Sequence, residues 1–239
     1  MTAQEMTVQE ISRLLRAMAD PVIAEHSARY FKTGPGEYGA GDRFLGIRVP
    51  DLRAQVKRCE AAVLEDIQLL LMSDFHEERL FALLLLVRRF ATGGEEQQAA
   101  VYHLYVDNLH RVNNWDLVDS SASRIVGSYL EPRDRKLLYR LVKSANIWER
   151  RVAIIATFRF IGNDQFDDAL KLARLLLNDK EDLIHKAVGW MLREIGKRDV
   201  AVEKAFLQAH YKNMPRTMLR YAIEKFPEPL RKKYLAGEI

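Results

Sequence analysis

The sequence predicts an all-α fold, an α-solenoid of stacked helix pairs, and three observations carry this prediction. Apolar residues recur at helical spacing along nearly the whole chain. Strict alternation of apolar and polar residues is rare and β-branched runs are short, so strands are not expected. One stretch of the second half recurs after 34 residues, which is within the range of known helical repeats.

The N-terminal part predicts two helices and then one long loop. The first helix is expected over Thr7–Ala19, where apolar residues face one side. The second is expected to begin at Asp20-Pro21, because proline is tolerated in a first helical turn, and to reach Phe31. Residues 33–43 contain four of the chain's twelve glycines and predict the loop. Pro50 then marks the start of the third helix.

From there the chain predicts helices almost without interruption. The expected ranges are 50–61, 63–72, 76–91, 94–111, 115–130, 132–144, 147–161, 165–177, 181–196, 199–211, 215–226 and 228–235. No linker composition separates these segments, so residues 1–239 are expected to form a single repeat domain.

The internal repeat is clearest between Arg151–Gly162 and His185–Gly196, where arginine, isoleucine and glycine recur at matched positions. Trp148 echoes Trp115 in the same way, 33 residues apart. Equivalent positions of stacked repeats project from one wall, so the curved array is expected to form a superhelix with a concave groove. The residues expected on that wall are Arg79, Trp115, Asp119, Trp148, Arg150, Arg151, His185, Lys186, Trp190 and Arg220.

Composition limits the function only loosely. The 239 residues include 48% hydrophobic ones, enough for a sizeable core, and carry a net charge of +4 with a pI near 9.1. Cys59 is the single cysteine, and no Cys/His pattern for a metal appears. The first five residues do not resemble a signal peptide, and the longest apolar run, Leu80 to Val87, is too short for a membrane span. A cytoplasmic protein is expected.

The most informative pair is Trp115 and Asp119, four residues apart and therefore on one face of a predicted helix. An aromatic ring beside a carboxylate suits a cation, or a centre that becomes cationic during a reaction. Lysine and arginine along the expected groove suit the phosphates of a nucleic acid.

Structural roles compete with each of these interpretations. A tryptophan at an apolar helix position is commonly core, above all Trp148. Asp119 could cap or salt-bridge a neighbouring repeat, and Arg151 could pair with an acid such as Glu149. Lys186 could simply be solvated, and His185 is expected to be packed and hydrogen-bonded rather than a ligand.

Four motifs stand out in order along the chain, and they are specific as a set. They are Phe44-Leu-Gly-Ile-Arg-Val-Pro50, Asn114-Trp-Asp-Leu-Val-Asp-Ser120, Asn146-Ile-Trp-Glu-Arg-Arg-Val-Ala153 and Ile184-His-Lys-Ala-Val-Gly-Trp-Met-Leu-Arg-Glu194. Together they resemble the AlkD-type DNA alkylation repair glycosylases, a family of HEAT-like helical repeats, and the resemblance covers about residues 30–230.

The resemblance implies an enzyme that excises cationic N3- and N7-alkylated purines from duplex DNA, without a pocket that engulfs a flipped base. It implies Asp119, Trp115, Trp190 and Arg151 as the catalytic set. The DNA-binding residues expected from the resemblance and the groove are Tyr30, Arg48, Arg150, Lys186 and Arg220. Neither a metal nor another cofactor is expected, and the protein is expected to act as a monomer associated with the nucleoid.

Two positions depart from the familiar members of that family. Glutamine is usual where Arg48 stands, and a second aromatic residue where Asn114 stands, which bears on lesion preference. Some relatives lack the catalytic set, so the alternative is a non-catalytic binder of distorted or branched DNA. A third alternative is a scaffold for protein–protein contacts, a common use of helical solenoids.

Overall fold

The computed structural model describes residues 6–239, so the first five residues, on which the signal-peptide expectation rests, lie outside it. Within the described range the chain is helical and contains no β-strand, apart from an isolated bridge between Arg43 and Phe75. None of the described helices is both long enough and apolar enough to cross a membrane. The chain divides into two compact units, Met1–Ile125 and Val126–Ile239. The expectation of one domain over 1–239 stays a prediction.

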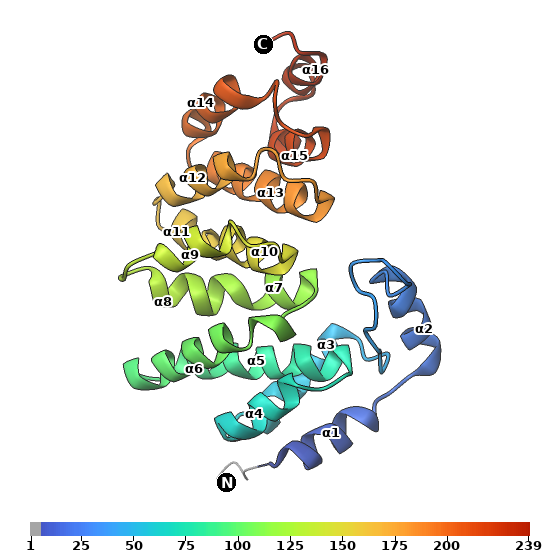
Figure 1. The fold of residues 1–239 in the computed structure, drawn as a ribbon. Coiled ribbons are helices and arrows are strands. Elements are labelled where there is room, and N and C mark those ends of the chain that lie inside the picture. Colours follow the sequence, from blue (N-terminus) through green and yellow to red (C-terminus); the bar gives the residue numbers. More distant parts are fainter. Residues whose placement is uncertain (1–5) are drawn as a thin grey trace. The chain divides into compact units, whose positions relative to one another are not determined.

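Unit 1 contains the helices of the first half of the chain (Figure 1). Its α-helices are α1 (Val8–Arg16), α2 (Pro21–Tyr30), α3 (Val49–Val56), α4 (Leu64–Leu71), α5 (His76–Thr92), α6 (Glu95–Asp107) and α7 (Trp115–Ala122). Two 3₁₀ turns, η1 (Lys57–Cys59) and η2 (Leu109–Arg111), follow α3 and α6.

Helix α5 is the centre of unit 1. It packs against α3, α4, α6 and α7, and every residue from His76 to Leu86 is buried. A helix enclosed by neighbours on several sides must be apolar around most of its circumference, which explains the run from Leu80 to Leu86. That apolar run is therefore core rather than a membrane segment.

Unit 2 contains the remaining helices, arranged around α13 (Asp182–Arg198), which packs against α10, α12, α14 and α15. The other helices are α8 (Ser128–Leu130), α9 (Lys136–Leu141), α10 (Ile147–Ala156), α11 (Phe158–Gly162), α12 (Asp167–Leu175), α14 (Val200–His210), α15 (Arg216–Ala222) and α16 (Glu228–Ala236), with a 3₁₀ turn η4 (Ile223–Lys225).

The two copies of the sequence repeat both lie on helices of unit 2. Arg151–Gly162 spans α10 and α11, and His185–Gly196 lies within α13. The described chain is helical and has no β-strand, so the all-helical repeat fold expected from the sequence is confirmed.

Two expected helices are interrupted. The helix expected over 115–130 is α-helical only to Ala122, and a π-helical turn, Ser123–Gly127, joins it to α8. The helix expected over 147–161 breaks at Thr157, whose hydroxyl donates to the Ile154 carbonyl at 2.6 Å. A threonine hydroxyl that bonds back to the preceding turn commonly bends a helix. Apolar periodicity alone continues through both breaks, so it could not have revealed them.

Candidate functional site

The first two turns of α7 carry Trp115 and Asp119, which lie one helical turn apart and are both half-buried. The first of these turns begins at Asn114, which is fully buried and whose Oδ1 accepts a hydrogen bond from the Trp115 backbone N–H at 2.9 Å. Asn146 also caps its helix, α10, but its Oδ1 accepts from the N–H two residues on, that of Trp148, at 2.9 Å. An N-cap of this kind fixes where a helix begins, and so fixes the positions of the side chains in its first turn.

Trp115 belongs to an aromatic cluster formed with the end of α2. Its ring stacks on Phe31, with centroids 5.2 Å apart and planes 13° apart, and Tyr30 meets it edge-on at 6.0 Å. Tyr30 itself is 59% exposed. One face of the Trp115 indole is thus covered by Phe31, which leaves only the opposite face and the edges to meet a ligand.

Asp119 lies near Tyr105, a fully buried tyrosine of α6. The Tyr105 hydroxyl hydrogen-bonds Ser121 of α7 at 3.0 Å. Burial raises the pKa of Tyr105 well above its ordinary value, and the nearby negative charge of Asp119 adds to the shift despite the opposing hydrogen bond from Ser121. The tyrosine beside Asp119 therefore remains a neutral hydroxyl at all physiological pH values.

A buried ionic network holds α7 to the glycine-rich segment 33–43. Asp42 of that segment accepts hydrogen bonds from Arg79 Nη2 at 2.6 Å, from His76 Nδ1 at 3.2 Å and from Asn114 Nδ2 at 3.2 Å. Its side chain is only 5% exposed. Burial opposes ionisation of Asp42, but the His76 hydrogen bond and the Arg79 charge outweigh it and hold the pKa of the carboxyl below its ordinary value.

His76 extends this network to α7 itself. Its Nε2 lies 2.8 Å from Oδ2 of Asp116, the residue between Trp115 and the apolar body of the helix. Burial alone would lower the pKa of His76, but the carboxylates of Asp116 and Asp42 raise it to about 9. The imidazole is therefore a cation at neutral pH, enclosed by two anions.

The start of α5 is the organising element of unit 1, and the sequence interpretation missed it. Besides His76 and Arg79, the buried carboxylate of Glu77 accepts the backbone N–H groups of residues 45–47 at 2.7–3.2 Å. Glu78 accepts from Arg16 Nε at 3.0 Å. A useful signal was available: four consecutive charged residues precede a long apolar run, and charged residues at a core position must be paired.

Arg79 therefore does not lie on a groove surface, contrary to the sequence expectation. It is 2% exposed and bound to Asp42 and to the Ser73 carbonyl. Trp148, 6% exposed, is core, as the structural interpretation held. His185 is half-buried and its Nε2 lies 2.6 Å from the Asp179 carbonyl, which confirms the expected packed and hydrogen-bonded role.

In unit 2, Arg151 and Trp190 both have partners within the unit. Arg151 is 4% exposed and its Nη1 donates to the Leu183 carbonyl. Trp190 is half-buried, its indole N–H donates to Glu194 at 3.0 Å, and its ring lies 5.9 Å from that of Phe158. Their joint action with Trp115 and Asp119 stays a prediction.

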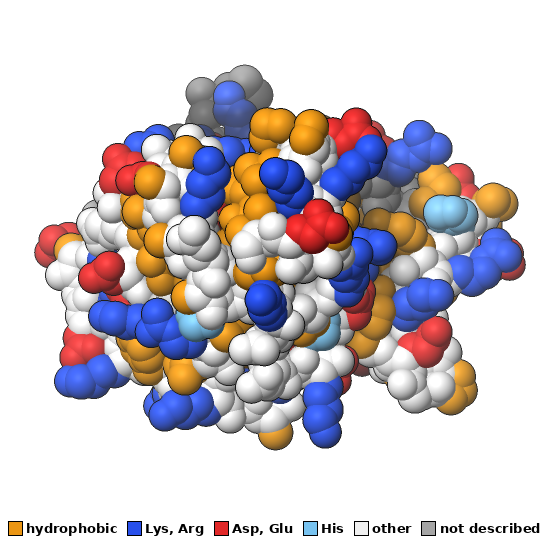
Figure 2. Space-filling model, turned by 90° about the horizontal axis from the view of Figure 1, so that it is seen from above, with side chains coloured by type: hydrophobic (Ala, Val, Ile, Leu, Met, Phe, Trp, Pro, Cys, Tyr) orange, Lys and Arg blue, Asp and Glu red, His pale blue; other side chains and the backbone are white. Residues whose placement is uncertain are grey.

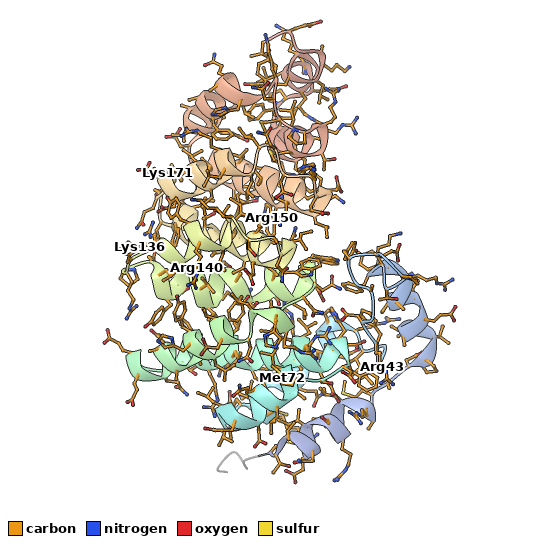
Figure 3. The ribbon with its side chains drawn as sticks, in the orientation of Figure 1. Arg43, Met72, Lys136, Arg140, Arg150 and Lys171 are labelled. Carbon is orange, nitrogen blue, oxygen red and sulfur yellow. The ribbon has the colours of Figure 1, made fainter. Side chains whose placement is uncertain are left out.

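The expected DNA-binding cations differ in how firmly they are held. Arg48, at the start of α3, and Arg220, on α15, are exposed. Lys186 is ion-paired with Asp182, one turn earlier on α13, at 2.8 Å. Arg150, labelled in Figure 3, is tied to Asp179 at 2.7 Å and to two backbone carbonyls.

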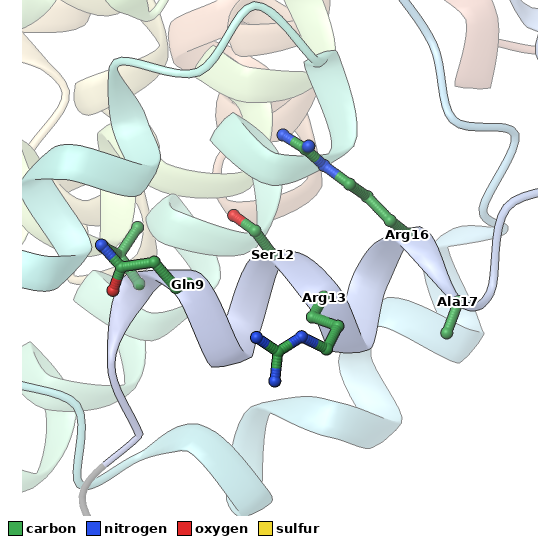
Figure 4. A pocket seen from close by; sticks show the side chains of 6 residues that line it. Gln9, Ser12, Arg13, Arg16 and Ala17 are labelled. Atoms are coloured by element: carbon green, nitrogen blue, oxygen red, sulfur yellow. The ribbon is translucent and has the colours of Figure 1, made fainter.

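Lysine and arginine are widespread on the face drawn in Figure 2, interspersed with carboxylates. A pocket of about 740 Å³ is lined by five residues of α1 and by Ala17, which directly follows that helix (Figure 4). Another pocket, of about 500 Å³, is lined by residues of unit 2 around Asp164–Lys171. Neither pocket contains an expected site residue. Within residues 6–239, no group of three or more His, Cys, Asp or Glu side chains could hold a metal ion.

Comparison with known proteins identifies the family. The family model described as DNA alkylation repair enzyme matches residues 11–226, most of the chain. The chain belongs to this family. The family is named for DNA alkylation repair, so the aromatic–carboxylate pair of α7 and the exposed cations are found in a chain of a DNA repair family. No curated protein sequence matches the chain.

Solved structures confirm the family's helical-repeat fold for this chain. A predicted DNA alkylation repair enzyme from Enterococcus faecalis has a TM-score of 0.69 at 18% identity, over 95% of this chain and 100% of the other. AlkD2 from Streptococcus mutans has a TM-score of 0.53 at 17% identity, over 92% of this chain and 98% of the other. At this identity the likeness concerns the fold.

Proposed function

We propose that the protein is a monofunctional DNA glycosylase that hydrolyses the N-glycosidic bond of cationic N3- and N7-alkylated purines in duplex DNA. The proposal rests chiefly on one observation: Trp115 and Asp119 share a face of α7, one turn apart, in a chain of the DNA alkylation repair family. An aromatic face and a carboxylate at that spacing suit a substrate that is already a cation.

The chemistry requires little from the protein. An N3- or N7-alkylpurine carries a positive charge, so the C1′–N bond can break and leave a neutral base without a general acid. The sugar then develops oxocarbenium character, which the Asp119 carboxylate stabilises electrostatically. Water attacks C1′ and gives up a proton, for which Asp119 is the base. The neighbouring Tyr105 hydroxyl stays neutral and so adds no charge of its own beside Asp119.

Trp115 contributes one ring face and its edges, because Phe31 covers the other face. A cation–π contact there is worth about 0.5–2 kcal/mol. Trp190 and Arg151 complete the proposed catalytic set, on the motifs that resemble the AlkD-type enzymes. The proposed DNA contacts are Tyr30, Arg48, Arg150, Lys186 and Arg220, of which Tyr30, Arg48 and Arg220 are exposed. The proposal includes a monomeric, cofactor-free, cytoplasmic enzyme.

The test measures, by chromatography, the release of free 7-methylguanine from a duplex that contains one such base. We expect release by the wild-type protein and its near-complete loss in Asp119→Asn, with binding to the duplex retained. Asp107→Asn is the matched control, because Asp107 is an exposed aspartate of α6 in the same unit. Equal loss in both variants would contradict the assignment to Asp119.

The other interpretations give different results in the same experiment. If the protein binds duplex DNA but releases no base from any N3- or N7-alkyl lesion, it is a binder of distorted or branched DNA. If it shows no binding even at low salt, where phosphate contacts are strongest, the result favours the scaffold interpretation.

A further inference from the structure

We propose that His76, as an imidazolium held between Asp42 and Asp116, is the positioning residue that sets Trp115 and Asp119 for the reaction. This inference rests on the proposed function, because it concerns how the same helix turn is held. His76 does not touch DNA in this proposal: it lies 1% exposed at the start of α5 and acts through α7.

The hydrogen-bond geometry defines the protonation of His76. Nδ1 lies 3.2 Å from Asp42 and Nε2 lies 2.8 Å from Asp116. A carboxylate only accepts hydrogen bonds, so both ring nitrogens must carry a proton for both bonds to form. A neutral imidazole has one N–H, and it would leave one of the two contacts without a donor.

The two carboxylates belong to the two segments that shape the site. Asp116 is the second residue of α7 and its Oδ1 also accepts the Leu117 N–H at 2.9 Å. Asp42 closes the glycine-rich segment, which is further tied to α5 by the bond from the His76 N–H to the Arg43 carbonyl at 2.8 Å. One imidazolium therefore joins α5, α7 and the segment 33–43.

The ring of His76 also supports Trp115 through aromatic contacts. Phe44 stacks on the imidazole at 4.7 Å, and Phe31 lies 4.9 Å from it at a tilt of 41°. Phe31 in turn stacks on Trp115. The orientation of Trp115 is thus set from two directions, by the backbone of α7 through Asp116 and by ring packing through Phe31.

The charged groups that face His76 all belong to this arrangement. Asp42 comes from the segment 33–43, Asp116 from α7 and Arg79 from α5 itself, where its charge opposes that of the imidazolium. Arg111 adds a further positive charge near Arg79. Two carboxylates thus face three cations. Removal of the imidazolium charge would take away the cation that is hydrogen-bonded to Asp116, while the charge of Arg79 would still attract that carboxylate.

The first measurement is imidazole ¹H–¹⁵N NMR of the wild-type protein at pH 7.5. We expect both ring nitrogens of His76 to be protonated. As pH rises through about 9, where His76 loses a proton, the Trp115 indole N–H resonance should shift with the same midpoint. A Trp115 resonance that is constant to pH 10 in folded protein, or a neutral His76 at pH 7.5, would overturn the proposal.

The second measurement is base release by His76→Gln and by the milder Asp116→Asn. Because misplacement by about 1 Å can cost a hundredfold in rate, we expect kcat to fall on the order of tenfold or more, with DNA binding unchanged. The pH-dependent shift of Trp115 should disappear in His76→Gln. His103→Gln, a change at an exposed histidine of α6, is the control.

The outcomes separate this inference from the proposed function. If the wild-type protein releases no base, the proposed function fails, while the NMR titration still decides whether His76 governs Trp115. If the wild-type protein is active and both folded variants retain wild-type kcat, the positioning role is wrong and the glycosylase proposal stands.

Discussion

The indole ring of Trp115 stacks on Phe31, with centroids 5.2 Å apart and planes 13° apart. Phe31 directly follows α2, whereas Trp115 opens α7, more than eighty residues later. The contact therefore couples the N-terminal helices to the turn that carries Asp119. Substitution of either partner should affect the other.

Phe31→Ala should disturb the orientation of the Trp115 indole but leave the position of Asp119 unchanged. Phe31 is half-buried, so the free energy of unfolding should fall by about 1–3 kcal/mol, less than the 3–5 typical of a fully buried phenylalanine. The turnover rate should fall by a larger factor than the affinity for DNA, because the Trp115 indole loses its stacking contact with Phe31. Near-UV circular dichroism would report the loss of order of the indole. Phe31→Leu, which retains much of the apolar contact, should be closer to wild type, and a larger defect in Phe31→Leu would contradict this explanation.

Gly46→Ala should destabilise unit 1 strongly. Gly46 has φ +83°, and an added Cβ would lie 2.0 Å from the Asp20 carbonyl oxygen and 2.6 Å from the Ala24 nitrogen. The matched control is Gly36→Ala, at φ +79° with no atom within 4 Å of the added Cβ, which carries only the conformational cost of about 1–2 kcal/mol. Thermal unfolding of both variants isolates the backbone clash. Equal Tm values for Gly46→Ala and Gly36→Ala would show that the α2 backbone shifts to make room for the added Cβ.

Glu203→Gln should remove a pH dependence of stability in unit 2. Glu203 is 2% exposed, its Oε1 accepts no hydrogen bond from residues 6–239, and burial raises its pKa from 4.5 to about 8. Between those values the folded state retains a proton that the unfolded state has lost, so rising pH favours unfolding. The wild-type free energy of unfolding should fall from pH 5 to pH 8 and then level off.

Urea unfolding at pH 5, 7 and 9 tests this expectation. Glu203→Gln should gain stability over wild type at pH 9 but little at pH 5. Glu228→Gln, at an exposed glutamate of α16, should follow the wild-type curve. A wild-type pH dependence that persists in Glu203→Gln would assign it to another group.

Arg220→Ala and Arg150→Ala should differ in kind. Arg220 is exposed, so its loss should weaken duplex binding and reduce the slope of log K against log salt by about 0.9, as for one phosphate contact. Arg150, also a proposed DNA contact, is held by Asp179 and two carbonyls, so its loss should lower the free energy of unfolding in addition to weakening duplex binding. Salt titrations and Tm measurements on both variants would show this contrast, and an unchanged slope for Arg220→Ala would remove Arg220 from the DNA contacts.

The sequence by itself determined the helical fold and the position of α7. Helical periodicity depends on neighbours within one helix, and the recurrence of Arg151–Gly162 at His185–Gly196 depends on the order of residues within each repeat. Both patterns are local, so they can be recognised in the amino-acid sequence. The spacing of Trp115 and Asp119 is local in the same sense, and the structure places both on α7. The helix breaks at Thr157 and at Ser123–Gly127 could not be predicted from the sequence, because local hydrogen bonding interrupts these helices without changing the apolar pattern.

Only the tertiary structure decided what holds that pair in place. Asp42, His76 and Asp116 are separated by 34 and 40 residues, and hydrogen bonds between them arise only when the glycine-rich segment, α5 and α7 pack together. Arg79 was expected on a DNA-facing surface, but the same packing buries it in an ion pair with Asp42. Sequence periodicity gives the face of a helix on which a charge lies. Whether that face meets solvent or a buried carboxylate depends on contacts between distant segments, which periodicity does not encode.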